Sequence, residues 1–375
     1  MKKNKFFLIT TVPMSLNFFK GQIAQLNKDF DVTLVSSPDK ELKSTAELEG
    51  VKYEPLAMKR DISIKNDIIS LVKFLYLFAK ERPNVIHCNT PKASLLSLLV
   101  GFITRVPVRI YYVHGLRYEG VSGKKRKLLI FLEKLSCFCA THIIAVSYGV
   151  KQKIESTLTN KNVSVIHYGS PNGLIVNDFL AVNYDPKVIR DEYNISEADF
   201  VFGFVGRLVG DKGINELVHA FNMLEQKNVK LVLVGIYEHE LDPLSQETQN
   251  IIKTNPNIIE VGFQKDVKKF LTIMDLFVSP SYREGFGLSV LEANLIKVPV
   301  LVTSITGYSE IVQEGKNGFF VDPKDTLALF NKMKKFSQSR DSLLAMKQQC
   351  YDEVASKYNH KEVLEKALEY YAQFK

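Results

Sequence analysis

The sequence predicts an α/β protein made of two doubly wound domains that face a central cleft. Three features lead to this: the length of 375 residues, the alternation of short apolar runs with longer amphipathic ones, and the apolar character of the short runs on both faces. A chain of this length exceeds what one hydrophobic core usually supports, so two domains are the natural division. Strands that are apolar on both faces belong to parallel sheets covered by helices on each side.

The strands expected in the first half are 6–10, 32–35, 85–87, 108–113, 142–146 and 163–166. Helices are expected between several of them, for example over 66–79 and 124–135. The second half repeats the pattern, with strands expected at 200–205, 229–234, 258–261, 275–279 and 298–302.

The join between the two halves is expected near residues 170–185, where Ser170-Pro-Asn-Gly173 and Asn177-Asp178 indicate a turn-rich crossing. We therefore expect a basic first domain over residues 1–175 and a second domain over residues 176–358. The segment 359–375 is expected to form an amphipathic helix that packs back on the first domain.

Charge is unevenly distributed along the chain. The net charge is +8, but residues 1–180 carry +12 and the remainder −4. A basic first half indicates an anionic partner such as nucleic acid, an anionic membrane surface or a phosphorylated substrate. No nucleic-acid-binding motif accompanies the charge, so we expect no nucleic-acid partner.

The N-terminus and the cysteines point to a cytoplasmic protein. The first 14 residues imitate a signal peptide, but Pro13 interrupts their apolar run and no small-residue cleavage site follows, so a first buried strand is expected. No apolar run reaches the roughly 20 residues that a membrane span needs. The four cysteines lack metal-ligand spacing, and we expect them to be buried reduced thiols.

The first segment that could carry chemistry runs from Phe202 to Gly213, FGFVGRLVGDKG. A strand ends at Val205, a glycine-rich loop follows, and a helix is expected from about Ile214. Backbone N–H groups at such a turn favour phosphate, and Arg207 and Lys212 add two cations. The stretch has neither a dinucleotide fingerprint nor a Walker sequence, and an ordinary strand–helix turn with solvated charges remains the alternative.

The second segment is SYREGFGLSVLEA, residues 281–293, in which Glu284 precedes Glu292 by eight positions. The loop through Gly285 and Gly287 lets a ligand approach the backbone, and a helix is expected from about Leu288. The two carboxylates lie about 10 Å apart along this segment, too far to share a proton but suited to gripping hydroxyls at two points. The alternatives are stabilisation of the helix dipole by Glu284 and an exposed helix face for Glu292.

These segments resemble the retaining, nucleotide-sugar-dependent glycosyltransferases of family 4, which have the two-domain GT-B fold. The resemblance is carried by Gly-Arg-Leu with Asp-Lys-Gly at 206–213, by Leu-Val-Leu-Val-Gly at 231–235, by the strand and loop at 275–281, by Glu-x7-Glu at 284–292, and by 307–312 and 315–318. It covers most of residues 200–325. The first half resembles the family more loosely, and residues 11–16 stand where many members have a Gly-Gly loop.

The resemblance implies roles for individual residues. Arg207 and Lys212, beside Gly206, would stabilise the leaving diphosphate without a metal or other cofactor. Glu284 would hold sugar hydroxyls and Glu292 the ribose hydroxyls. The backbone of Gly285, Phe286, Gly287 and Leu288 would contact the donor. His114 looks like the family histidine at the donor sugar, the alternative being a loop histidine that only hydrogen-bonds.

The acceptor is expected to be a glycan or a polyprenyl-diphosphate-linked glycan of bacterial capsule or surface polysaccharide, and the donor a UDP-sugar in preference to a GDP-sugar. The basic and apolar stretch Lys124–Leu135 fits an anionic membrane surface, and it equally fits a core helix with a solvated basic start. The only Asp-x-Asp, at Asp29 and Asp31, is expected to be structural. A GT-B sugar-nucleotide epimerase and a non-catalytic nucleotide-sugar- or glycan-binding protein are the competing hypotheses.

Overall fold

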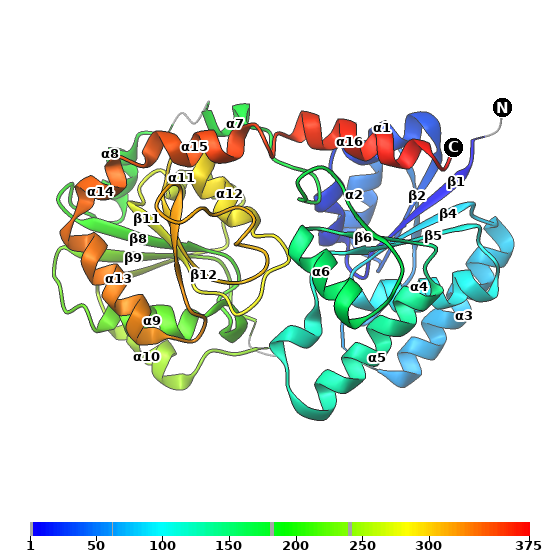
Figure 1. Ribbon diagram of the computed structural model, residues 1–375, viewed down its shortest axis with the longest axis horizontal. Coiled ribbons are helices and arrows are strands. Elements are labelled where there is room, and N and C mark those ends of the chain that lie inside the picture. The colour runs from blue at the N-terminus through cyan, green and yellow to red at the C-terminus, as the bar shows by residue number, and fades with distance from the viewer. Residues whose placement is uncertain (1–2, 62, 181–183, 239–241) are drawn as a thin grey trace. The chain divides into compact units, whose positions relative to one another are not determined.

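The computed structural model describes residues 3–61, 63–180, 184–238 and 242–375, which form two compact units. Unit 1 comprises residues 1–173 and 360–375, and unit 2 comprises residues 174–359. Each unit has its own parallel sheet with helices on both faces (Figure 1). The two doubly wound sheets confirm the predicted fold class.

Unit 1 contains a seven-stranded sheet in the order β3-β2-β1-β4-β5-β6-β7. Its strands are β1 (Lys5–Ile9), β2 (Asp31–Ser36), β3 (Lys52–Pro55), β4 (Val85–Asn89), β5 (Val108–Val113), β6 (His142–Ala145) and β7 (Val163–Val165). Its helices are η1 (Pro13–Phe19), α1 (Gln22–Asp29), α2 (Lys40–Glu49), α3 (Ile64–Glu81), α4 (Pro91–Ile103), η2 (Arg117–Gly120), α5 (Gly123–Cys139), α6 (Tyr148–Thr157) and α16 (His360–Ala372).

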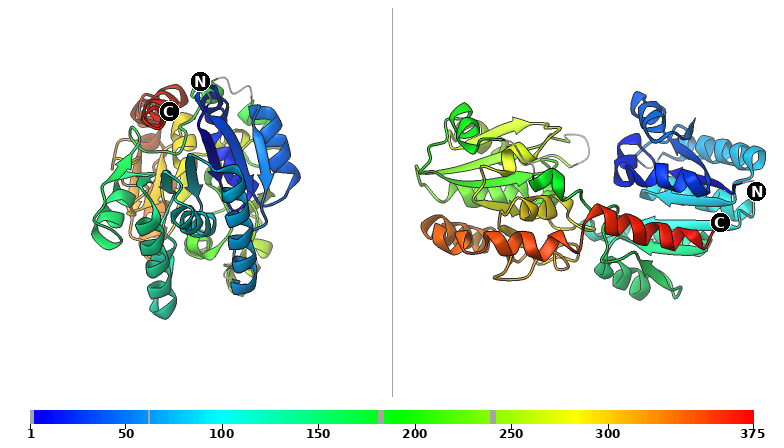
Figure 2. Two further views of the ribbon diagram at one scale, coloured as in Figure 1. Left: turned by 90° about the vertical axis from the view of Figure 1, so that its right-hand side faces the viewer. Right: turned by 90° about the horizontal axis from the view of Figure 1, so that it is seen from above.

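Helix α16 is the last helix of the chain and belongs to unit 1, where it packs against α1. It is the red helix in Figure 2, beside the blue N-terminal elements. Its inward face presents Val363, Ala367 and Tyr371, spaced four residues apart and all buried. The amphipathic spacing seen in the sequence thus places one turn after another against the unit 1 core.

Unit 2 contains a six-stranded sheet in the order β10-β9-β8-β11-β12-β13. Its strands are β8 (Phe200–Val205), β9 (Val229–Val234), β10 (Ile258–Gly262), β11 (Leu276–Ser279), β12 (Val300–Thr303) and β13 (Gly318–Val321). Its helices are α7 (Asn177–Leu180), α8 (Pro186–Glu192), η3 (Gly210–Lys212), α9 (Ile214–Asn222), α10 (Gln246–Thr254), α11 (Lys268–Leu271), α12 (Leu288–Leu295), α13 (Thr326–Gln338), α14 (Arg340–Leu344) and α15 (Lys347–Ala355).

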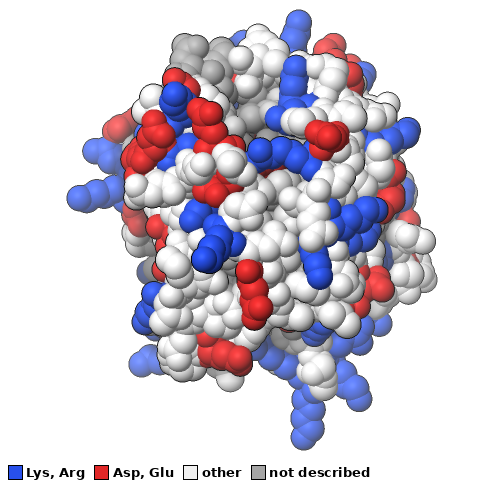
Figure 3. All heavy atoms as spheres, turned by 90° about the vertical axis from the view of Figure 1, so that its left-hand side faces the viewer, with Lys and Arg blue, Asp and Glu red and all other residues white. Residues whose placement is uncertain are grey.

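The surface of unit 2 carries mixed charge. On the face drawn in Figure 3, Lys and Arg are interspersed with Asp and Glu. This agrees with the small net charge of the second half of the sequence, against the +12 of residues 1–180. The excess positive charge of the protein therefore lies in unit 1.

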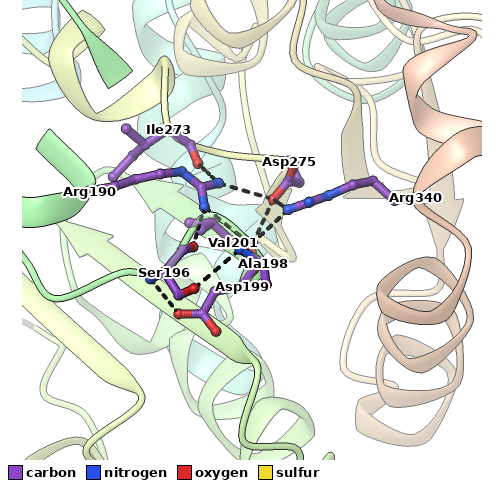
Figure 4. Close-up of polar contacts among 8 residues, drawn as sticks. All are labelled: Arg190, Ser196, Ala198, Asp199, Val201, Ile273, Asp275 and Arg340. Atoms are coloured by element: carbon purple, nitrogen blue, oxygen red, sulfur yellow. Dashed lines mark hydrogen bonds and ion pairs between the residues drawn. The ribbon is translucent and has the colours of Figure 1, made fainter. Parts of the chain in front are cut away.

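A partly buried ion cluster stabilises the edge of the unit 2 sheet where its central strands begin (Figure 4). Asp275, just before β11, accepts hydrogen bonds from Val201 N at 2.8 Å and from Arg340 Nη2 at 2.7 Å. Arg190 Nη2 lies 3.5 Å from the same carboxylate and also donates to the Ile273 carbonyl. The cluster ties α8 and α14 to the sheet, so Asp275 has a structural role at the edge away from the loops described next.

The four cysteines are free and buried, as expected from the sequence. Within the described residues, no helix is both long and apolar enough to cross a bilayer.

Candidate active site

The loops after β8 and β11 meet in unit 2 because these strands are neighbours in the sheet. From β8 the chain builds the sheet outward through β9 and β10, and then returns to β11 on the other side. Loops that leave neighbouring strands in opposite directions open a crevice at the carboxyl edge of a sheet, and ligands of open α/β sheets bind there.

Gly213 lets the two loops touch. Its φ is +70°, and a Cβ at this position would lie 2.1 Å from the carbonyl oxygen of Pro280 in the β11–α12 loop. A side chain would therefore push the loops apart. Because they are in contact, Lys212 Nζ forms an ion pair with Glu284 Oε1, and both side chains are only about one-fifth exposed.

Tyr308 contacts the Glu284 carboxylate of this ion pair. Its hydroxyl lies 3.4 Å from Glu284 Oε1 and 2.6 Å from Ser279 Oγ, and its ring is fully buried. Burial, with the Glu284 charge as a second cause, raises the pKa of Tyr308 well above its usual range. The hydroxyl therefore stays protonated and can donate a hydrogen bond, which keeps the Glu284 carboxylate in place.

Two further cation–carboxylate pairs involve these loops, one of them with a partner in the loop after β9. Arg207 Nη1 is 2.5 Å from Glu238 Oε2, and Arg283 Nη2 is 2.5 Å from Asp211 Oδ2. Arg207 and Lys212 were expected from the sequence, whereas Arg283, Glu238 and the supporting Tyr308 were not assigned a role. Their positions depend on contacts between segments far apart in the chain, for which a single sequence carries no signal.

The backbone of the β11–α12 loop offers hydrogen-bond donors. Among the described residues, none accepts a hydrogen bond from the N–H groups of Gly285, Phe286, Gly287 or Leu288. Gly287 has φ +95°, and the space where its Cβ would stand is taken by the Tyr308 ring, 2.6 Å away. The Tyr308 ring thus packs where the Cβ of another residue would stand. The N–H groups of residues 285–288 remain available to an anion at the start of α12.

Glu292 lies in the second turn of α12, between the buried Leu291 and Ala293. No residue in the described part of the chain forms a hydrogen bond or ion pair with its carboxylate. Burial, followed by the nearby charge of Asp266, raises the pKa of Glu292 to about 7. A half-buried carboxylate without a partner is costly to the folded protein, and a ligand that donates hydrogen bonds to it would relieve that cost.

His114 belongs to unit 1, where it follows β5 and is partly buried. Its Nε2 is 3.0 Å from Asn89 Oδ1 at the end of the neighbouring β4. Its ring is stacked between Phe18 and Tyr112, at centroid distances of 5.4 and 4.4 Å. Burial lowers the pKa of His114 to about 4, so the ring is neutral at physiological pH.

Residues 11–16, which differ from the Gly-Gly loop of many relatives, include the first residues of the 3₁₀ helix η1. Thr11 is tied down from two sides: its N–H donates to Thr90 Oγ1 at 3.0 Å, and its hydroxyl accepts from Ala93 N at 3.2 Å. Phe18, in the same short helix, stacks on the His114 ring. In this chain the loop after β1 is thus an ordered support for the histidine.

The Asp29 and Asp31 carboxylates are engaged in ion pairs, with Lys375 and Lys52 at 2.9 and 2.8 Å. Among the described residues, no group of three or more His, Cys, Asp or Glu side chains could hold a metal ion.

Comparison with known proteins identifies the family. Residues 23–170 match the family described as "Glycosyltransferase Family 4", and residues 185–353 match "Glycosyl transferases group 1". The capsular polysaccharide biosynthesis glycosyltransferase CapM of Staphylococcus aureus is 39% identical over 341 residues, which cover 89% of this chain and 88% of that protein. An Escherichia coli enzyme, UDP-Gal:alpha-D-GlcNAc-diphosphoundecaprenol alpha-1,3-galactosyltransferase, is 24% identical over 89% of this chain and 86% of its own length.

Among solved structures, HepE of Anabaena in complex with UDP and glucose has the same fold, with a TM-score of 0.83 over 99% of this chain and 100% of that one at 19% identity. Fold and relatives together define a nucleotide-sugar glycosyltransferase with the GT-B fold. The chain belongs to the group 1 glycosyltransferases of family 4.

Proposed function

We propose that this glycosyltransferase moves a hexose or N-acetylhexosamine, with retention, from a UDP-sugar to a polyprenyl-diphosphate-linked glycan in the assembly of bacterial capsule or surface polysaccharide. The observation that carries the proposal is the pairing of Lys212 with Glu284 across two loops at the carboxyl edge of the unit 2 sheet. The pair brings a cation and a carboxylate together, which supports binding of the diphosphate by Lys212 and of sugar hydroxyls by Glu284.

Arg207 and Lys212 stabilise the departing diphosphate. Negative charge grows on the leaving group as the anomeric bond breaks, and cations already held in position favour that transition state. Their carboxylate partners, Glu238 and Glu284, hold the two cations in place before the donor binds. The N–H groups of residues 285–288 add donors to the phosphate oxygens, and no metal ion is required in this scheme.

The two carboxylates of the Glu-x7-Glu segment bind hydroxyl groups at opposite ends of the donor. Glu284 accepts hydrogen bonds from the sugar ring, next to the diphosphate cation Lys212. Glu292 accepts from the ribose, which compensates its burial without a partner. The same arrangement leaves no enzyme carboxylate as a nucleophile, in contrast to retaining glycosidases with their closely paired acids. The departing phosphate instead helps deprotonate the acceptor hydroxyl on the face that it leaves.

The lipid-linked acceptor is supported by the relatives and by the surface of unit 1. CapM acts in capsule biosynthesis by its name, and the E. coli relative acts on a diphosphoundecaprenol-linked sugar. Helices α3, α4 and α5 pack side by side on one face of the unit 1 sheet (Figure 1). The exposed side chains on α3 and α5 include large apolar ones, namely Ile64, Ile68, Val72, Tyr76, Leu128, Phe131 and Phe138.

Lysines and one arginine at 124–127 begin α5 and are exposed beside this apolar surface. Apolar side chains that enter a bilayer together with cations that meet its phosphates are the features of a peripheral contact with an anionic membrane. We therefore place the enzyme in the cytoplasm, at the inner face of the cytoplasmic membrane.

The donor and the activity are tested by nucleotide release from a panel of UDP- and GDP-sugars, with and without lipid extract, for the wild type and Glu284→Ala. Release from one UDP-sugar that rises with lipid and is lost in the variant supports the proposal. Binding of a donor without release under any condition refutes it and favours a non-catalytic binding protein. Analysis of the product's anomeric configuration by NMR tests retention.

The membrane contact is tested by co-sedimentation with vesicles of phosphatidylglycerol or phosphatidylcholine. Phe131→Glu is expected to abolish binding to the anionic vesicles. Leu327→Glu, a matched change at an exposed apolar residue of α13 in unit 2, is expected to leave binding unchanged. Equal binding of both variants contradicts the assignment of this surface.

A further inference from the structure

Four polar side chains of unit 1 form a continuous hydrogen-bonded row from His114 to the C-terminal helix. His114 Nε2 lies 3.0 Å from Asn89 Oδ1, Asn89 Nδ2 lies 3.0 Å from His87 Nδ1, and His87 Nε2 lies 2.8 Å from the Tyr371 hydroxyl. His87 and Asn89 are on β4, and Tyr371 is on α16. These last three side chains are each 1% exposed. Because water does not reach these groups, the polar atoms of the row pair with one another.

The direction of every hydrogen bond in the row follows from the Asn89 amide. Its Nδ2 also lies 3.1 Å from the His87 carbonyl and 3.4 Å from the Ile9 carbonyl, so the amide nitrogen faces this side and Oδ1 faces His114. A carbonyl oxygen only accepts, and hence His114 Nε2 carries the proton. On the other side Asn89 Nδ2 donates to His87 Nδ1, which must be the unprotonated nitrogen of that ring.

Both imidazoles are neutral at physiological pH. Burial lowers the pKa of His114 to about 4 and that of His87 to about 3. A neutral His87 with an unprotonated Nδ1 holds its proton on Nε2 and donates it to Tyr371. A neutral His114 with its proton on Nε2 has a free lone pair on Nδ1. All donors in the row thus point from His114 towards α16.

The lone pair of His114 Nδ1 has a fixed direction. The ring lies between Phe18 and Tyr112, at interplanar angles of 18° and 29°, and it meets the edge of Phe19 at a centroid distance of 5.8 Å. Rotation of the ring would break these contacts and the bond to Asn89. No hydrogen bond to Nδ1 comes from any described residue, which leaves this atom as the one polar group of the ring that a ligand can use.

We propose that Asn89, His87 and Tyr371 are positioning residues that hold His114 as the Nε2–H tautomer, so that its Nδ1 accepts a hydrogen bond from a substrate hydroxyl. This deepens the proposed function and rests on it for the identity of the hydroxyl, which belongs to a sugar. His114 then orients the substrate and does not exchange a proton with it. Helix α16 supports the row, because the Tyr371 hydroxyl accepts the proton of His87 Nε2 and so holds that ring beside Asn89.

The tautomer is measured directly, without substrate, by long-range proton–nitrogen NMR of the full chain labelled at histidine with nitrogen-15. The His114 signals are assigned by their loss in His114→Gln. At pH 7 we expect wild-type His114 to be neutral with its proton on Nε2. Asn89→Leu is expected to give a mixture of both tautomers, since the acceptor is gone. A proton on Nδ1 in the wild type, a doubly protonated ring, or an unchanged tautomer in Asn89→Leu overturns the proposal.

The dependence on α16 is tested by Tyr371→Phe, with Tyr370→Phe as the matched control. Tyr370 is the preceding residue of the same helix, and its hydroxyl bonds to Ser164 outside the row. With the donor found in the panel above, Tyr371→Phe is expected to lower kcat about 2- to 10-fold, the range that one neutral hydrogen bond supports. Tyr370→Phe is expected to leave kcat unchanged.

A double-mutant comparison separates positioning from a general loss of structure. In the His114→Ala background, Tyr371→Phe is expected to cause no further fall in kcat, because the row then has nothing left to hold. Equal losses in both backgrounds overturn the proposal. If no donor is turned over at all, the proposed function fails while the NMR result still decides the tautomer.

Discussion

Glu292→Gln should make the protein more stable at high pH while weakening its hold on the nucleotide. The glutamate lies partly buried in α12 without a hydrogen-bond or ion-pair partner among the described residues, and burial raises its pKa to about 7 from an ordinary 4.5. Glutamine has nearly the same shape and never carries the charge. The substitution therefore removes the cost of burying a carboxylate and changes little else.

The size of the effect follows from proton linkage. Between pH 4.5 and 7 the unfolded chain has released the Glu292 proton and the folded chain still holds it, so the free energy of unfolding falls as pH rises through this window. One pKa unit corresponds to about 1.4 kcal/mol, which gives a loss of up to about 3 kcal/mol above pH 7. Glu292→Gln should recover this amount at pH 8 and have little effect at pH 5.

The assay is urea denaturation of the wild type and the variant at pH 5 and pH 8, followed by far-ultraviolet circular dichroism because the chain has no tryptophan. The informative quantity is the change in the free energy of unfolding caused by Glu292→Gln at pH 8 minus the change that it causes at pH 5. This difference cancels any cost of the amide that does not depend on pH. Glu197→Gln, at an exposed residue of unit 2, serves as the control and should shift stability by less than about 0.5 kcal/mol at either pH. An equal effect of Glu292→Gln at both pH values would refute the reasoning.

The same residue links stability to binding. If ribose hydroxyls donate to the ionised carboxylate, the Kd for UDP should decrease as pH rises through about 7, by at most about tenfold per pH unit. Glu292→Gln should remove this dependence and weaken binding at pH 8. Calorimetric titration with UDP measures both, and a pH-independent Kd in the wild type would argue against the assigned role.

Three further predictions concern the ion cluster and the two loops of unit 2. Asp275→Ala should lower the free energy of unfolding by about 3 kcal/mol, since two guanidinium groups and a backbone N–H lose their acceptor. Thermal denaturation measures this loss, and a change under about 1 kcal/mol would contradict the structural role of the cluster. Lys212→Met should reduce kcat about 10²- to 10³-fold with the melting temperature preserved, and a defect confined to KM would speak against charge stabilisation in the transition state. Gly213→Ala should destabilise the protein by clearly more than Gly50→Ala. Both glycines have positive φ, but only at Gly213 would the new Cβ meet the backbone of another segment. Similar melting temperatures of the two variants would disprove the loop contact.

The central strands of both sheets were predictable because burial on both faces leaves an uninterrupted apolar run. The observed β5, β8 and β9 coincide with the predicted ranges. Of the four edge strands, β7 and β10 were predicted from their apolar residues, whereas β3 and β13 carry no such signal. Every residue of β3 is exposed and it ends in Pro55, and β13 begins with Gly318. An edge strand is stabilised by hydrogen bonds to its one neighbour, which composition does not reveal.

The loops of the candidate site were also predictable, since glycines and charges directly after a strand indicate a phosphate-binding turn. The partners of those charges were not. Arg207 pairs with Glu238, 31 residues away, and Lys212 with Glu284, 72 residues away. Which carboxylate meets which cation depends on strand order in the sheet and on the close backbone approach at Gly213.

By itself the sequence determined the fold class, the family and the loops that carry the charged groups, because these follow from local pattern and spacing. Only the tertiary structure decided the protonation and orientation of the groups. The row that begins at His114 takes its tautomer from the Asn89 amide, and it ends with a contact between His87 and Tyr371, 284 residues apart, that exists only once α16 is docked. The raised pKa of Glu292 likewise comes from burial among packed neighbours. Burial and hydrogen-bond direction are properties of the assembled core, and no short stretch of sequence contains them.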